Sequence, residues 1–140
     1  MADWCGEPAP ARLVEGIAQF NRGEYFEQHE TLELLWRAEP RDVRRLYQGI
    51  LQIGVACLHL QRLNHHGAVY MLTRGSRYLQ PFTPRCQGVD VAALIDAAAA
   101  ALEEVHRLGA GRLAEFDWRL APRVTLVESG SAGSALTRTV

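Results

Sequence analysis

The stretch from Glu24 to Ala38 carries a histidine and a glutamate whose spacing suits chemistry. His29 and Glu33 are four residues apart, which places two side chains on the same face of a helix. An imidazole and a carboxylate in this arrangement can bind one metal ion or share one proton. Glu30 follows His29 directly and is a candidate general base. Glu30 and Glu33 are therefore the catalytic candidates.

A second polar row follows one face of the stretch 41–64. At about 100° of rotation per residue, several of its side chains fall within roughly 60° of one another. These are Gln48, Gln52, Val55, His59 and Arg62. The row is either the solvent face that an amphipathic helix needs or the lining of a site. The same choice holds for His29, which is either a ligand or a core histidine held by one hydrogen bond, for example to Glu33.

Several familiar chemistries are excluded or disfavoured by the sequence. The string from His29 to Glu33 is not a zincin motif, because that motif needs a second histidine where Glu33 stands. Neither central helix carries the Glu-x-x-His pair of a diiron site. All 15 basic residues are arginine, so there is no lysine for a Schiff base. The net charge of −1 and the absence of a dense arginine stripe argue against nucleic acid as a partner.

Hydrophobic spacing predicts the helices that must position these residues, at 9–20, 24–38, 41–64, 67–79 and 90–108. Asp90 is the expected N-cap of the last helix, and Gly109 its expected end. No strand-rich region is predicted. The predicted fold is all-α: a compact, mainly up-and-down bundle of about five helices with an extended C-terminal segment.

The stretch 41–64 is the expected central helix because its apolar face is the longest. That face consists of Leu46, Ile50, Ile53, Cys57 and Leu60. Gly49 and Gly54 are expected where neighbouring helices approach closely. Trp36 is most simply a core anchor, and His65 and His66 are expected as exposed turn residues.

Four parts of the chain are expected. They are an N-terminal segment at 1–8, the helical bundle at 9–109, a C-terminal extension packing on the bundle at 110–128, and a disordered tail at 129–140. No secretion signal and no apolar run of about 20 residues is present, so a cytoplasmic protein without a membrane segment is expected.

The three cysteines, Cys5, Cys57 and Cys86, are an odd number at wide spacings. This fits neither a disulfide framework nor a cysteine-rich zinc site, and free thiols are expected. Cys57 lies on the apolar face of the central helix and is expected to be buried and inert.

Two motifs in order resemble a bacterial and archaeal family catalogued as domain of unknown function 309. They are Phe20-Asn21-x-Gly23-x-Tyr25-Phe26-Glu27-x-His29-Glu30-x-Leu32-Glu33-x-x-Trp36, then Tyr47-Gln48-Gly49-x-x-Gln52 and His59, with Asn64, Gly67, Ala68 and Leu72 continuing the match. The resemblance covers roughly residues 12–108. It implies a small helical bundle in which the polar residues of two successive helices face each other, and it implies no reaction, because the family has none assigned.

The predicted binding residues are His29, Glu33, Gln48, Gln52, His59 and Asn64. One hypothesis is a domain that uses this cluster, between the second and third helices, to bind a small ligand or a partner helix. The alternative is a metal-dependent hydrolase-like enzyme with a divalent cation held by His29, Glu33 and His59. A third hypothesis is a structural oligomer, in the simplest case a homodimer.

Overall fold

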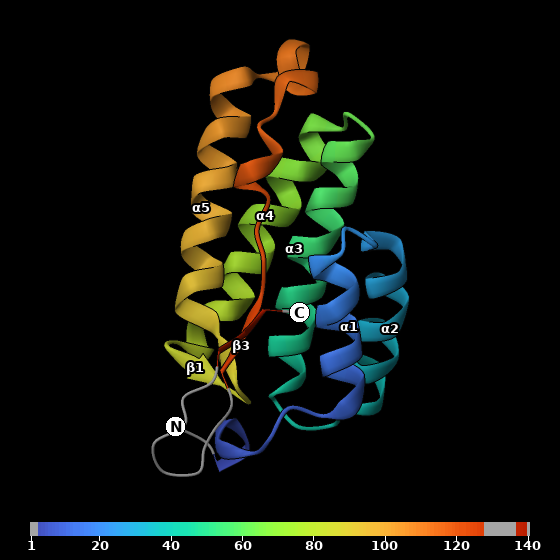
Figure 1. The fold of residues 1–140 in the computed structure, drawn as a ribbon, viewed down its shortest axis with the longest axis vertical. Helices are drawn as coiled ribbons and strands as arrows, with labels where there is room; N and C mark the ends of the chain where they lie inside the picture. The colour runs from blue at the N-terminus through green and yellow to red at the C-terminus, as the bar shows by residue number, and fades with distance from the viewer. Residues whose placement is uncertain (1–2, 128–136, 140) are drawn as a thin grey trace.

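Five α-helices make up most of this computed structural model, which describes residues 3–127 and 137–139. They are α1 (Ala11–Asn21), α2 (Tyr25–Ala38), α3 (Arg44–Gln61), α4 (His65–Leu79) and α5 (Val91–Leu108). Each helix packs on the next along the chain, and α3 lies between α2 and α4 (Figure 1). The predicted all-α bundle, mainly up-and-down around a long central helix, is confirmed.

The apolar face predicted for α3 lies in the core. Its members are at most 2% exposed: Leu46, Ile50, Ile53, Cys57 and Leu60. Both glycines of α3 lie at close helix contacts, as predicted. A Cβ on Gly49 would be 3.1 Å from the backbone oxygen of Gly75 on α4, and a Cβ on Gly54 would overlap the amide of Gln28 on α2. The central helix is therefore approached closely from both sides.

Helix α3 is shorter than the predicted range 41–64, since it runs from Arg44 to Gln61, and α4 begins at His65 and not at the predicted residue 67. Leu63 has a φ of 56°, a left-handed conformation through which a helix does not continue. Asn64 then caps α4, because its Oδ1 accepts a hydrogen bond from the backbone N–H of Gly67 at 2.9 Å. The residues after Gln61 thus end one helix and start the next.

Two other helix ends carry polar contacts. His65 begins α4 and is not a free turn residue, since its Nε2 lies 3.3 Å from the backbone oxygen of Val105 on α5. His66 is exposed, as predicted. Asp90 is the N-cap of α5, as predicted, and its Oδ1 accepts from the N–H of Ala93 at 3.0 Å. Gly109, with a φ of 68°, ends the helix.

A small antiparallel sheet, which the hydrophobic pattern does not predict, has the strand order β1-β2-β3-β4. Its strands are β1 (Arg85–Cys86), β2 (Val89–Asp90), β3 (Thr125–Val127) and β4 (Thr137–Thr139). Gln87 and Gly88 link β1 to β2 with positive φ angles of 48° and 78°, which fits a tight hairpin turn. Side-chain and backbone contacts, described below, hold Gln87 in this unusual conformation.

The C-terminal extension returns along the bundle into β3 (Figure 1). The side chain of Asn21 accepts from the N–H of Val124 at 2.9 Å and donates to its backbone oxygen at 2.8 Å. Of the tail predicted to be disordered at 129–140, residues 129–136 and 140 lie outside the described residues. The remaining three form β4 beside β3. Within the described part of the chain, no helix is both long and apolar enough to cross a membrane.

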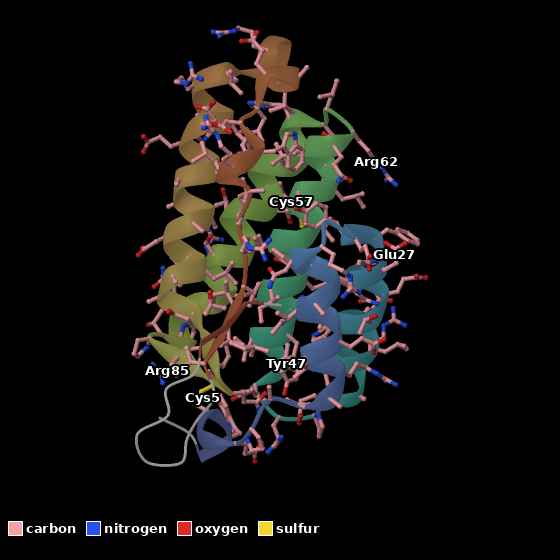
Figure 2. All side chains as sticks on the ribbon, viewed as in Figure 1. Cys5, Glu27, Tyr47, Cys57, Arg62 and Arg85 are labelled. Carbon is pink, nitrogen blue, oxygen red and sulfur yellow. A yellow bond between two sulfur atoms is a disulfide. The ribbon has the colours of Figure 1, made fainter. Side chains whose placement is uncertain are left out.

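The prediction of three free thiols is wrong for two of them, because Cys5 and Cys86 form a disulfide. Figure 2 shows Cys5 at the same end of the bundle as Arg85, next to the β1–β2 hairpin. The sequence separation of 81 between the two cysteines conceals this proximity in the sequence. Cys57 is a free, fully buried thiol, as predicted, and burial raises its pKa to about 12.

Candidate functional site

A cavity of about 230 Å³ lies on α3 between the helices that flank it. Its lining consists of His29, Glu33 and Trp36 from α2, Gln48, Leu51, Gln52 and Val55 from α3, and Met71 from α4. We call it the α2–α3 cavity. It brings together four of the predicted site residues, which sequence spacing had placed on two separate helices.

Helix α2 contributes a stripe of three side chains. His29, Glu33 and Trp36 stand at i, i+4 and i+7, so they fall on one face of the helix. The Nε2 of His29 lies 3.3 Å from a carboxylate oxygen of Glu33, and both side chains are about one third exposed. The other carboxylate oxygen of Glu33 pairs with Arg37 at 3.5 Å. The pair therefore sits at the rim of the cavity, where it can donate or accept a proton.

Helix α3 contributes two glutamines, of which one has a hydrogen-bonded amide oxygen and the other does not. Gln48 is partly exposed, and its Oε1 accepts a hydrogen bond from Arg45 at 2.6 Å. Gln52 is 7% exposed, and its Oε1 is buried without a hydrogen-bond partner in the structure. A buried, unpaired amide oxygen costs about 1–3 kcal/mol relative to a paired one.

Trp36, another lining residue, has a second buried polar atom of this kind. The indole Nε1 of Trp36 has no hydrogen-bond partner in the structure, although an indole N–H is a donor that usually finds one when buried. Above the same ring lies the guanidinium of Arg44, with Cζ 5.5 Å from the ring centroid. Two lining residues, Trp36 and Gln52, thus offer one unused donor and one unused acceptor.

His59 and Asn64 do not reach the α2–α3 cavity. Asn64 Nδ2 lies 3.2 Å from His59 Nδ1, and the His59 ring packs where a Cβ on Gly67 would otherwise lie. This group closes the corner between α3 and α4. Burial and the charge of Arg62 lower the pKa of His59. The predicted binding role of His59 and Asn64 stays a prediction, but the two residues belong to another part of the surface.

The three-residue metal set predicted from the sequence is not assembled. His29 and Glu33 meet, but His59 lies at the α3–α4 corner, and no group of three or more His, Cys, Asp or Glu side chains in the described ranges is placed to hold a metal ion. Glu30 is exposed and does not line the cavity. His59 shares a helix face with Gln48 and Gln52 but not their cavity. The helix rises about 1.5 Å per residue, so residues on one face can lie far apart along the helix axis.

Sequence reasoning missed Gln28, which is fully buried between α2 and α3. Its Nε2 donates to the backbone oxygen of Leu51 at 3.2 Å, and its position over Gly54 explains why α3 has no side chain there. The sequence could have indicated this burial, because the helical spacing puts Gln28 on the same apolar face as Tyr25 and Leu32. Gln28 sets the spacing of the two helices that form the cavity.

The comparisons with known proteins agree with the motif resemblance. Residues 13–71 match the model of a family described as Domain of unknown function (DUF309). The resemblance is confirmed over these residues, which include every side chain that lines the α2–α3 cavity. The uncharacterized protein YpuF of Bacillus subtilis is 29% identical over an aligned length of 105 residues, and the match covers 72% of this chain. The chain spans 60% of the length of that relative.

Proposed function

With the match of residues 13–71 to domain of unknown function 309 as the premise, we propose that this chain binds a small polar ligand in the α2–α3 cavity. The observation that carries the proposal is the pair of buried, unpartnered polar atoms, Gln52 Oε1 and Trp36 Nε1, in residues that line one cavity. Buried polar groups in folded proteins are nearly always paired, so two exceptions at one cavity favour a bound partner.

The chemistry of the lining indicates the class of ligand. Gln52 Oε1 needs a donor, and Trp36 Nε1 needs an acceptor, so the ligand carries both, as a carboxamide or a hydroxy-carbonyl group does. The His29–Glu33 pair at the rim adds a third polar contact. A cavity of about 230 Å³ holds roughly eight water-sized groups at about 30 Å³ each. The part of the ligand that enters the cavity is therefore the size of a small metabolite.

The test is a screen of small carboxamides and hydroxy acids, read by the indole N–H signal of Trp36 in a nitrogen–proton correlation spectrum. We expect a binder to shift this signal, and we expect the shift to disappear in Gln52→Met and in His29→Ala. Gln61→Met is the matched control, because Gln61 is an exposed glutamine at the end of the same helix. Binding that persists in both site variants would contradict the proposal.

The metal-dependent hydrolase remains the competing function because His29 and Glu33 already lie 3.3 Å apart and could supply two ligands. Titration of the untagged protein with Zn²⁺ and Mn²⁺, followed by calorimetry, separates the two. We expect no stoichiometric binding at micromolar affinity. Stoichiometric metal that is lost in His29→Ala would favour the hydrolase instead.

We also propose that the protein acts in the cytoplasm, with a small molecule as its principal partner. Cell fractionation tests the location. A partner helix or a homodimer would compete for the same face between α2 and α4, and light scattering distinguishes a monomer from a dimer in solution. A stable dimer that dissociates when a cavity ligand is added would favour the oligomer hypothesis.

A further inference from the structure

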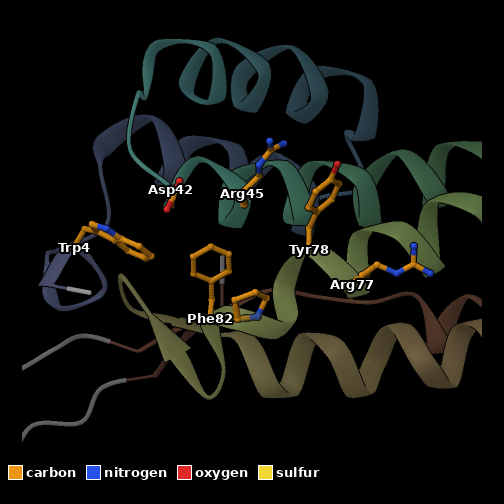
Figure 3. A pocket seen from close by; sticks show the side chains of 7 residues that line it. Trp4, Asp42, Arg45, Arg77, Tyr78 and Phe82 are labelled. Atoms are coloured by element: carbon orange, nitrogen blue, oxygen red, sulfur yellow. The ribbon is translucent and has the colours of Figure 1, made fainter. Parts of the chain in front are cut away.

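A larger cavity, of about 450 Å³, lies where the N-terminal segment meets α3 and α4 (Figure 3). Its lining consists of Trp4, Asp42, Arg45, Arg77, Tyr78, Pro81 and Phe82. We call it the Trp4 cavity. Its volume falls within the range of about 300–1,000 Å³ that is usual for small-molecule sites. None of its lining residues is shared with the α2–α3 cavity.

Aromatic rings form two sides of the Trp4 cavity. The ring of Trp4 packs on Phe82 with centroids 5.6 Å apart, and Tyr78 stands on the other side of Phe82 in Figure 3. Flat apolar walls of this kind favour a flat apolar ligand, because aromatic surfaces stack or meet edge to face. The body of the ligand is therefore expected to be an aromatic ring.

The Trp4 wall is held in place by the β1–β2 hairpin, 81 positions later in the sequence. The next residue, Cys5, is bonded to Cys86. Gln87 adds two hydrogen bonds: its Nε2 donates to the backbone oxygen of Trp4 at 3.1 Å, and its backbone N–H donates to that of Cys5 at 2.8 Å. Tyr47 in turn donates to Gln87 Oε1 at 2.7 Å. The cavity is consequently formed before any ligand arrives.

Two arginines, Arg45 and Arg77, line this cavity. Among the described residues, neither forms an ion pair with a carboxylate. By contrast, the nearby Arg41 pairs with both Glu7 and Glu39. The guanidinium of Arg45 lies over the ring of Tyr78, with Cζ 5.5 Å from its centroid.

Asp42 is the single carboxylate in the lining, and it stands near Trp4. Figure 3 places both arginines on the opposite side of Phe82 from Trp4. Of the two arginines, Arg45 lies nearer to the Trp4–Phe82 pair, while the guanidinium of Arg77 points away from it beyond Tyr78. A ligand with its ring against the Trp4–Phe82 pair and its anionic group toward Arg45 meets an apolar wall and a positive charge.

From this geometry we propose that the Trp4 cavity binds a small aromatic carboxylate, with its ring against Trp4 and Phe82 and its carboxylate on Arg45, the arginine that Figure 3 places nearer to these rings. Guanidinium groups recognise carboxylates through paired, charge-assisted hydrogen bonds. No residue lines both cavities, and Arg45 of the Trp4 cavity hydrogen-bonds Gln48 of the α2–α3 cavity at 2.6 Å.

Calorimetry with indole-3-carboxylate as the probe, and its neutral isostere indole-3-carboxamide as the matched ligand, tests the charge requirement. We expect the carboxylate to bind about tenfold more tightly, the difference that one charge-assisted hydrogen bond supplies. We expect Arg45→Gln to weaken carboxylate binding by about tenfold and to leave carboxamide binding unchanged. Equal affinities of the two probes would overturn the proposal.

Two further variants locate the binding. Arg112→Gln removes the same charge from an exposed arginine outside both cavities and should leave the affinity unchanged. Trp4→Ala removes one wall and should abolish binding, while an unchanged melting temperature of its disulfide-bonded form confirms that it folds. Gln52→Met, which alters the other cavity, should bind indole-3-carboxylate normally. Full affinity in a folded Arg45→Gln protein would refute the assignment.

Discussion

Replacing Gln52 by methionine is expected to stabilise the protein and to abolish ligand binding in the α2–α3 cavity. The side chain is 7% exposed, and its Oε1 is buried without a partner. Methionine has a similar length and fills irregular gaps in a core, so it keeps the packing and removes the unpaired amide. Stability and binding should therefore change in opposite directions, as is common at functional sites.

The expected size of the stabilisation follows from the burial of this amide. An unpaired buried amide costs about 1–3 kcal/mol, so we expect a gain of about 1–2 kcal/mol after imperfect repacking. The 140 residues imply an unfolding entropy of about 0.3 kcal/mol/K, at about 2.1 cal/mol/K per residue. The melting temperature should then rise by about 3–7 °C.

Urea unfolding and scanning calorimetry of the ligand-free protein measure this change. The matched control is Gln48→Met, one turn earlier on α3, where Oε1 already accepts from Arg45 at 2.6 Å. That variant loses a hydrogen bond and gains nothing by burial, so its free energy of unfolding should stay equal or fall slightly. A Gln52→Met protein that is less stable than the parent by more than about 1 kcal/mol would show that the amide is paired, and the reasoning would fail.

Three further predictions rest on other parts of the structure. Gly49→Ala should lower the free energy of unfolding by about 1–3 kcal/mol, because its Cβ would meet Leu79 and the backbone oxygen of Gly75; urea unfolding measures it, with Gly111→Ala, where a Cβ meets nothing within 4 Å, as the neutral control. The pKa of His59 is lowered by burial and by Arg62, so the folded state favours the neutral ring. Stability from this residue is present above the ordinary histidine pKa of about 6.5 and is lost as the pH falls; unfolding at pH 7 and pH 5 should show a smaller loss in His59→Gln, and an identical loss would contradict the assignment. The native protein should show no thiol reactive toward a disulfide reagent at pH 8, and one after unfolding without reductant, because Cys57 is buried with a pKa of about 12 while Cys5 and Cys86 are bonded; two or three reactive thiols would contradict the disulfide.

Much of the fold could be predicted from local spacing. The apolar face of α3, the Asp90 cap and the Gly109 end each depend on residues within a few positions of one another. The predicted end at Asn64 was late because Leu63 adopts a left-handed conformation, which hydrophobic spacing does not reveal. The cap at Asn64 is a local signal that could have placed this boundary.

The candidate site was predictable in part for the same reason. Spacing put His29 and Glu33 together, and it put Gln48 and Gln52 on one face of the next helix. It also added His59, seven residues beyond Gln52 on the same face. Seven residues correspond to about 10 Å of helix rise, so the row is longer than one cavity. The spacing thus identified the face of α3 that lines the site, but not how far along the helix axis the site extends.

The amino-acid sequence by itself determined which segments are helical, where most of them end, and which faces are apolar, because these properties depend on neighbours three or four residues away. Only the tertiary structure decided the Cys5–Cys86 bond, the hairpin at Gln87, and which polar side chains share a cavity. These depend on contacts between segments as far as 81 residues apart, and such contacts form only when the packed helices have brought those segments together.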